Sequence, residues 1–282
     1  MHSEGLVITN KMFQISMGPQ NPSVQRVISL FRGSIEKTLL ISKLNDIYSR
    51  VAEYKNPKDF AEKTLDCLNI TWKIDNGECD SIPSEGPLVV VCNHPFGVIE
   101  SLVLASLLLK VRPDSKIMAN YLLGRIPQLS SIFFCVDPLE GPAAARQNAG
   151  SLKNAISWLQ EGHVLATFPA GQVSSLNLQR LQIADPKWST ITGRIIRKTC
   201  ASVLPIYFEG CNSAAFHAAG LIHPHLRTAL LPHELLKKQN STVKIRTGTP
   251  IPFQKVSKII CDDELTEYLR MRTYLCTPLP KE

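Results

Sequence analysis

The residues best placed to do chemistry are a histidine and a glutamate that follow one apolar run. Residues 88–92 are typical of a buried strand, and a Pro-Phe-Gly sequence at 95–97 separates them from an apolar helical pattern. His94 stands at the end of the strand, and Glu100 follows six residues later. The strand would hold the backbone, the turn would expose the imidazole, and the acid could orient it, as a general base requires. The sequence therefore predicts a catalytic His94 paired with Glu100. The plainer alternatives are a loop histidine bonded to backbone groups and an acid that only stabilises a helix start.

A second motif, Phe-Pro-Ala-Gly-Gln-Val-Ser at 168–174, follows another strand-like run. Gly171 permits a close backbone approach that a side chain would block. The alternative is a tight Pro-Gly turn that contacts no ligand.

Together the two motifs resemble those of the glycerolipid acyltransferase superfamily, whose first block carries His-x-x-x-x-Asp. Here the acid is Glu100, one residue later than in that block. The His-Pro-Phe-Gly-x-Ile-Glu version is similar to a bacterial hemolysin-like subgroup related to lyso-ornithine lipid acyltransferases. That subgroup has Phe-Pro-Ala-Gly-Glu-Val-Ser as its second signature, so Gln172 replaces a glutamate. Further matching blocks lie at 185–188, 203–205 with 210–213, and 226–228, and several ordered blocks are more specific than one motif.

The resemblance implies a set of site residues. His94 would take a proton from the acceptor, and Glu100 would bind the other ring nitrogen. In the superfamily the second block carries an acid that positions a glycerol phosphate acceptor; Gln172 keeps hydrogen bonding there but removes the charge. Arg125 lies in a block that often contacts the acceptor's phosphate, since a guanidinium suits phosphate or carboxylate. The substrate-binding candidates are Asn93, Phe96, Gly97, Arg125, Arg146, Asn148, Phe168, Pro169, Gly171, Gln172 and Ser174, with Arg180 as a further arginine.

By this resemblance we expect the protein to move a fatty acyl group from an acyl carrier protein or coenzyme A thioester to a lysolipid or amino-acid-derived lipid acceptor. Lyso-ornithine or other amino-acid-derived acceptors are favoured over lysophosphatidate, and no cofactor beyond the thioester co-substrate is expected. Three alternatives stay open. They are a 1-acylglycerol-3-phosphate acyltransferase, a hydrolase in which Ser174 attacks, and a non-catalytic lipid or acyl-carrier binding protein. The hydrolase lacks the Gly-x-Ser-x-Gly elbow.

Composition adds limits on partners and compartment. The 282 residues are 44% hydrophobic and 20% charged, with a net charge of +7, which describes a globular protein. Basic residues are dispersed without interleaved aromatics, so nucleic acid is not indicated; anionic lipid and an acidic carrier protein fit better. The eight cysteines form no Cys-x-x-Cys pair, and His-Pro-His at 223–225 has no third ligand nearby. A polar loop is expected there, and no metal site. The longest apolar segment, 102–109, is too short to cross a bilayer, and residues 1–5 start no signal peptide, which predicts a cytoplasmic protein.

The periodicity predicts an α/β fold with a central, largely parallel sheet flanked by helices and an N-terminal helical extension. Strands are expected at 70–74, 88–92, 116–119, 132–136, 164–168, 203–208 and 243–247. Helices are expected at 34–54, 57–68, 99–110, 143–160, 188–199 and 214–220, with a shorter apolar stretch at 24–30. Both motifs then follow strands at their carboxyl ends, where α/β folds bind ligands. We divide the chain into an N-terminal helical segment, 1–80, and an acyltransferase domain, 81–282. The N-terminal helices either close the core or lie on the inner face of the membrane, with Phe31, Leu39 and Leu40 inserting.

Overall fold

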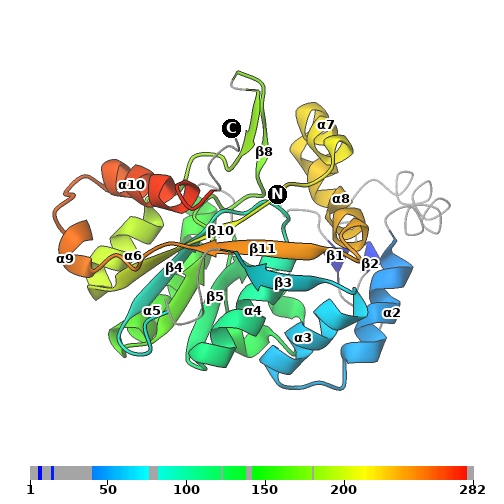
Figure 1. Cartoon of the computed structure of the whole chain (residues 1–282), viewed down its shortest axis with the longest axis horizontal. Helices are drawn as coiled ribbons and strands as arrows, with labels where there is room; N and C mark the ends of the chain where they lie inside the picture. The colour runs from blue at the N-terminus through cyan, green and yellow to red at the C-terminus, as the bar shows by residue number, and fades with distance from the viewer. Residues whose placement is uncertain are drawn as a thin grey trace.

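The computed structural model describes residues 6–7, 14–15, 40–75, 82–121, 123–137, 142–179 and 181–277 (Figure 1). The predicted stretch at 24–30, the candidate membrane residues Phe31 and Leu39, and Arg180 lie outside these ranges. A short antiparallel pair, β1 (Leu6–Val7) and β2 (Gln14–Ile15), is described near the N-terminus.

A seven-stranded sheet organises the molecule, in the order β3-β11-β10-β4-β7-β5-β6. Every neighbouring pair is parallel except β10 with β11. The strands are β3 (Thr71–Ile74), β4 (Leu88–Cys92), β5 (Ser115–Asn120), β6 (Phe133–Val136), β7 (Val164–Thr167), β10 (Ser202–Phe208) and β11 (Thr242–Thr247). The mostly parallel α/β architecture predicted from the sequence is therefore confirmed.

Strand β4 lies at the centre because all five of its side chains are apolar or weakly polar and fully buried. Leu88, Val90 and Cys92 point into the core on one face of the sheet, whereas Val89 and Val91 point into the core on the other. A strand covered on both faces needs such a continuous apolar run.

Helices cover both faces of the sheet (Figure 1). The core on the first face includes side chains of α2 (Ile41–Val51), α3 (Pro57–Cys67) and α4 (Ile99–Val111). The core on the second face includes side chains of α5 (Pro142–Gln160), α6 (Ile191–Thr199) and α10 (Asp262–Tyr274). Shorter helical segments in the described ranges include α9 (Phe253–Val256) and the 3-10 turns Leu123–Arg125 and Ser130–Ile132.

Most predicted elements are present within a residue or two of their expected ends. The Asn56 side chain caps α3, accepting from the N–H groups of Lys58 and Asp59. Helix α6 begins at Ile191 instead of 188. The segment before it is held to the second motif, because Ser189 N donates to the carbonyl of Pro169 at 2.9 Å.

Two elements near the motifs were not predicted. Strands β8 (Ser175–Asn177) and β9 (Gln182–Ala184) form an antiparallel hairpin after the second motif. Helix α8 (Pro224–Lys237) follows α7 (Ala214–Ile222) almost directly. The polar loop predicted at 223–225 is therefore wrong: His223 ends α7 and Pro224 starts α8, where a missing N–H costs nothing.

Helices α2 and α3 and strand β3 belong to the same packed unit as the motifs. Strand β3 pairs in parallel with β11, and Leu44 and Val51 of α2 are buried in the core of the first face. Leu40, one of the predicted membrane-inserting residues, packs partly buried against that core. The division at residue 80 stays a prediction. Among the described helices, none has both the length and the apolar character needed to cross a membrane.

Candidate active site

The two sequence motifs meet at the carboxyl edge of the sheet, because β4 and β7 are adjacent and parallel. His94 follows β4 and the segment from Phe168 to Ser174 follows β7. The Ser174 N–H donates to the His94 carbonyl at 2.8 Å and joins the two loops. Gly171, with φ +64, closes the second turn by donating its N–H to the Phe168 carbonyl at 2.9 Å.

The His94 ring is held between the Glu100 carboxylate and an aromatic face. Its Nδ1 lies 3.3 Å from Glu100 Oε1. The Phe168 ring stacks on the imidazole, with centroids 4.4 Å apart and planes 29° apart. Nδ1 is buried and makes no directional hydrogen bond to any described residue, so this contact is electrostatic in the present geometry. The side chain is 15% exposed, so Nε2, on the opposite side of the ring, is the nitrogen that can face a substrate.

Glu100 reaches the histidine because the intervening turn folds around its carboxylate. The side chain is fully buried at the start of α4. It accepts from the Phe96 N–H at 2.5 Å and from the Gly97 N–H at 2.9 Å. Gly97 has φ +113, a conformation that side chains rarely adopt, and this brings the N–H groups back toward the acid. Peptide donors and the helix start stabilise the charge that would balance an imidazolium.

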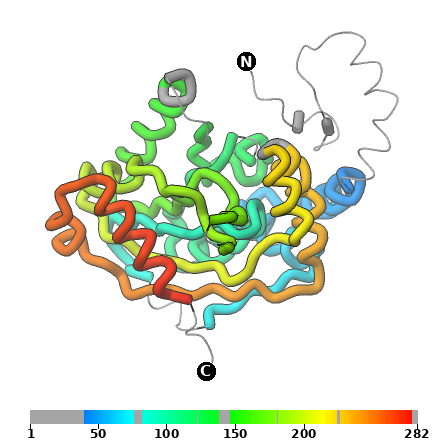
Figure 2. Tube along the Cα trace, turned by 90° about the horizontal axis from the view of Figure 1, so that it is seen from above, coloured from blue at the N-terminus to red at the C-terminus, as the bar shows by residue number. Residues whose placement is uncertain are grey.

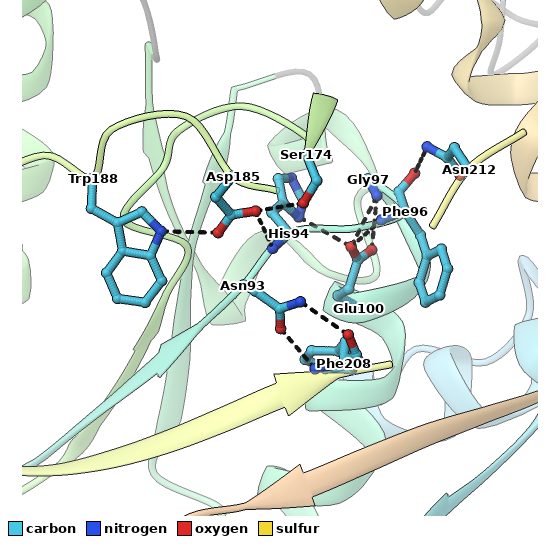
Figure 3. A network of polar contacts seen from close by, with 10 residues as sticks. All are labelled: Asn93, His94, Phe96, Gly97, Glu100, Ser174, Asp185, Trp188, Phe208 and Asn212. Carbon is cyan, nitrogen blue, oxygen red and sulfur yellow. Dashed lines mark hydrogen bonds and ion pairs between the residues drawn. The ribbon is translucent and has the colours of Figure 1, made fainter. Parts of the chain in front are cut away.

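A second buried carboxylate, Asp185, holds the backbone of the histidine (Figure 3). Its Oδ1 accepts from the His94 N–H at 3.1 Å and from Ser174 Oγ at 2.5 Å. Its Oδ2 accepts from the Trp188 indole at 2.9 Å. Burial raises the pKa of Asp185, and these hydrogen bonds oppose the rise. Asp185 therefore anchors the loop that presents the imidazole, without touching the ring in any described contact.

Helix α10 fixes Asp185 in turn. The Asp185 N–H donates to the Tyr274 hydroxyl at 2.9 Å, and an Arg270 guanidinium N–H donates to the Asp185 carbonyl at 3.2 Å. Burial raises the pKa of Tyr274, so its hydroxyl stays protonated. The support of the site thus extends to the C-terminal helix.

The side-chain amides of two predicted substrate-binding residues form hydrogen bonds with backbone groups of the protein. Asn93 exchanges two hydrogen bonds with Phe208, at 2.9 and 2.7 Å, and ties the end of β4 to β10. Asn148 does the same with Asp137, at 2.7 and 2.8 Å, between α5 and the end of β6. In the structure both side chains position elements of the fold.

No described contact links Arg125 or Arg146 to the group around His94, and their predicted role in substrate binding stays a prediction. Arg125 is exposed beyond β5, with its guanidinium carbon 5.5 Å from the Tyr121 ring centroid. β7 separates β5 from β4, which places them about 10 Å apart. Arg146 is exposed on α5. The arginine that the structure does bring to the second motif is Arg227, whose Nη2 donates to Gln172 Oε1 at 3.2 Å.

Comparison of the sequence with known protein families identifies an acyltransferase family. The profile of a family described as "Acyltransferase" matches residues 17–278. The chain belongs to this acyltransferase family. The predicted membership of the acyltransferase superfamily is thereby confirmed, and the hemolysin-like subgroup stays a prediction.

Two similar proteins are named lyso-glycine lipid O-acyltransferase. The protein from Phocaeicola vulgatus is 24% identical over 278 residues, covering 95% of this chain and 94% of the relative. The one from Bacteroides thetaiotaomicron is 26% identical, covering 90% and 92%. Among solved structures, the 1-acyl-sn-glycerophosphate (LPA) acyltransferase PlsC from Thermotoga maritima matches with a TM-score of 0.46 and 14% identity, over 90% of this chain and 95% of that one.

Ser174 of this acyltransferase has no free role as a nucleophile. Its side chain is buried and its hydroxyl donates to Asp185. A hydrolase would need that oxygen exposed beside a base. In the described part of the chain, no three His, Cys, Asp or Glu side chains gather as a metal site.

Asp185, Trp188 and Arg227 are the site residues to which sequence reasoning assigned no role. All three stand in blocks that matched the superfamily, at 185–188 and 226–228. Their position within ordered blocks was the available signal. Their contacts with His94, Ser174 and Gln172 become visible only in the folded chain.

Proposed function

We propose that this acyltransferase transfers a fatty acyl group from an acyl thioester to the hydroxyl of an amino-acid-derived lysolipid, with His94 as the general base. The observation that supports this most directly is the 3.3 Å contact between His94 Nδ1 and the buried Glu100 carboxylate. Because Nδ1 faces Glu100, Nε2 lies on the partly exposed side of the ring, where it can accept a proton from an incoming hydroxyl.

The reaction proceeds by attack on the thioester. The acceptor oxygen bonds to the carbonyl carbon while its proton passes to His94 Nε2. The Glu100 charge stabilises the resulting imidazolium, much as the aspartate does in a Ser-His-Asp triad. The C–S bond then breaks, and the departing sulfur takes the proton from Nε2 and leaves as a thiol. His94 is neutral again at the end of the cycle.

The acceptor class is inferred from the relatives. Both are named for a lyso-glycine lipid, and each matches over nine-tenths of its length. We therefore favour an acceptor in which an amino acid forms the headgroup over lysophosphatidate. Acyl carrier protein is the preferred donor and coenzyme A the alternative; the net charge of +7 suits either acidic donor.

We further propose that the protein works on the inner face of the membrane, because both acceptor and product carry acyl chains. Two neighbouring segments support this, the β8–β9 hairpin and the end of α7 with the start of α8, and we call them the two tips. Hairpin β8–β9 follows β7 and helix α7 follows β10, so both rise from the carboxyl edge of the sheet and they contact each other (Figure 1). The view from above shows the hairpin between α10 and the α7–α8 pair (Figure 2). The tips carry six exposed large apolar side chains: Leu178, Leu181, Ile183, Leu221, Ile222 and Leu226.

Lipid profiles test the reaction. We expect cells expressing the wild type to accumulate a diacylated amino-acid lipid that cells expressing folded His94→Ala lack. Purified protein with acyl carrier protein or coenzyme A thioesters would then identify the donor. A lysophosphatidate product alone would contradict the acceptor class, and a fully active His94→Ala variant would contradict the base.

Vesicle sedimentation tests the membrane contact. Leu181→Ser with Ile222→Ser removes the most exposed apolar side chain of each tip, at 82% and 78% exposed. We expect weaker binding to phosphatidylglycerol vesicles, because less apolar surface can enter the interface. Ile260→Ser is the matched control, since Ile260 is 87% exposed but lies in the loop before α10. Equal loss in the control would refute the role of the tips, and loss only on removing residues 1–39 would locate the contact in that segment.

A further inference from the structure

Arg227 is a partly buried cation that is held by neutral groups. Its guanidinium donates to Gln172 Oε1 and lies 5.9 Å from the Phe216 ring centroid. Its side chain runs along Gly220 of α7, where an added Cβ would lie 3.2 Å from Arg227 Cδ. Across the described part of the chain it forms no ion pair with an acid. Burial lowers the pKa of Arg227, which reflects the cost of keeping this charge away from water.

This cation lies close to the catalytic turn. Leu231 follows Arg227 by one turn of α8, and its Cδ2 would lie 2.8 Å from a Cβ on Gly97. On the other side, Gln172 is two residues from Ser174, whose N–H bonds to the His94 carbonyl. Arg227 is therefore within reach of a small headgroup whose reactive end lies at His94.

A buried histidine with incomplete hydrogen bonding lies in the same region. His217 of α7 is only 5% exposed, and neither of its buried ring nitrogens makes a well-aligned hydrogen bond to a described residue. The backbone of Asn212 is a polar neighbour of the ring. Burial lowers the pKa of His217 and the Arg227 charge lowers it further, whereas the Asn212 backbone and the Glu234 charge oppose this shift. Because the net direction is downward, the neutral ring is favoured, and it can donate one N–H. The nearby Glu234 is already satisfied, because it accepts from the Ser213 hydroxyl at 2.5 Å and the Ser213 N–H at 2.8 Å. Buried polar groups are normally well paired, so an incompletely bonded imidazole close to a guanidinium without an ion-pair partner points to a ligand.

We propose that Arg227 binds the carboxylate of the acceptor headgroup, with His217 and Gln172 as neutral hydrogen-bonding neighbours. This inference rests on the proposed function and specifies the acceptor further. An amino acid acylated on its amine keeps a free carboxylate, and the planar guanidinium fork matches its two oxygens.

Charge balance favours a carboxylate over a phosphate. One guanidinium neutralises one carboxylate, whereas a phosphate monoester carries about −1.5 to −2 at neutral pH. With a buried Glu234 nearby and neutral His217 and Gln172, the excess negative charge would be left uncompensated. The neutral side chain of Gln172 leaves the Arg227 charge available to the ligand. A glutamate at position 172 would form an ion pair with Arg227 and compete with the ligand carboxylate.

A binding measurement separates this site from the reaction. The probe is N-palmitoylglycine, with its methyl ester as the neutral comparison, titrated calorimetrically into the wild type and three variants. We expect Arg227→Gln to weaken N-palmitoylglycine binding about tenfold or more and to leave the ester unchanged, because only the acid uses the charge. Arg227→Lys should restore part of the affinity. Gln172→Glu should weaken the acid as Arg227→Gln does, and it tests the site even if Arg227→Gln fails to fold.

Kinetics and controls complete the test. In acyl transfer, Arg227→Gln should raise the KM of the carboxylate acceptor with little change in kcat or donor KM. Arg50→Gln is the charge-matched control, because Arg50 is an exposed residue of α2 paired with Asp46. Equal losses for acid and ester, or an unchanged acid affinity in both Arg227→Gln and Gln172→Glu, would overturn the site. A selective loss of lysophosphatidate use would overturn the carboxylate assignment. Charge-dependent binding without any acyl transfer would keep the site and refute the proposed function.

Discussion

Two buried carboxylates flank His94, and they do different work. Glu100 contacts the imidazole, and its other described partners are the N–H groups of Phe96 and Gly97, within four residues. Asp185 contacts the histidine backbone from 91 residues away and is held by Ser174, Trp188 and Tyr274. The acid that can influence the proton is therefore part of one local turn, whereas the acid that places the ring depends on the whole tertiary structure.

The largest effects on acyl transfer should come from changing His94 or Glu100, the acid that contacts the imidazole. His94→Ala should lower kcat by about 10³-fold and Glu100→Gln by about 10²-fold, since one removes the base and the other its counter-charge. If Glu100 acts through the imidazole, the double variant should be no slower than His94→Ala. Steady-state acyl transfer by protein with unchanged circular dichroism measures this. A further loss in the double variant would show that Glu100 has a role independent of His94.

Asp185→Asn should affect stability more than chemistry. The amide keeps an oxygen for the His94 N–H but turns an NH₂ toward the Trp188 indole donor, at a cost of about 1–3 kcal/mol in the free energy of unfolding. Displacement of the loop should lower kcat by about tenfold, less than Glu100→Gln. A rate loss equal to that of Glu100→Gln would remove the distinction between the two acids.

The pH dependence of stability sharpens the same comparison. Burial raises the pKa of Asp185 in the folded protein above its unfolded-state value of about 4. The resulting contribution to the free energy of unfolding is therefore fully present below about pH 4 and is lost as the pH rises through the folded-state pKa. The difference in unfolding free energy between wild type and Asp185→Asn should therefore fall as pH rises from 4 and then level off. Urea denaturation across pH 4 to 8 measures it. A difference that grows with pH would mean that the hydrogen bonds outweigh burial.

The smallest effect is expected at Trp188, the outermost support of Asp185. Trp188→Phe keeps an aromatic ring at a position that is 1% exposed but removes the indole donor to Oδ2. We expect the free energy of unfolding to fall by about 1–2 kcal/mol and kcat to stay within about twofold. Thermal unfolding and acyl-transfer rates check both. A large rate loss here would place Trp188 among the residues that control the imidazole.

Elements with regular apolar periodicity were predictable and irregular ones were not. Strand β4 and helices α3 and α4 were predicted nearly to the residue because an apolar run or a cap marks their ends. Helix α8 was missed because Pro232 lies inside it and interrupts the expected pattern. The β8–β9 hairpin was missed because none of its strand side chains is fully buried and they show no alternation of buried and exposed positions.

For the site, the amino-acid sequence by itself determined the pair that can move a proton. A strand, a glycine-containing turn and a helix start lie within thirteen residues, and local backbone geometry brings Glu100 back to His94. Only the tertiary structure decided which groups support and surround that pair. Asp185 contacts His94, and Arg227 contacts Gln172 of the second motif, because parallel strands bring their carboxyl ends to one edge and because α8 and α10 pack there. Contacts between residues so far apart in the chain depend on the packing of every element between them. The spacing of residues in the sequence therefore does not predict these contacts.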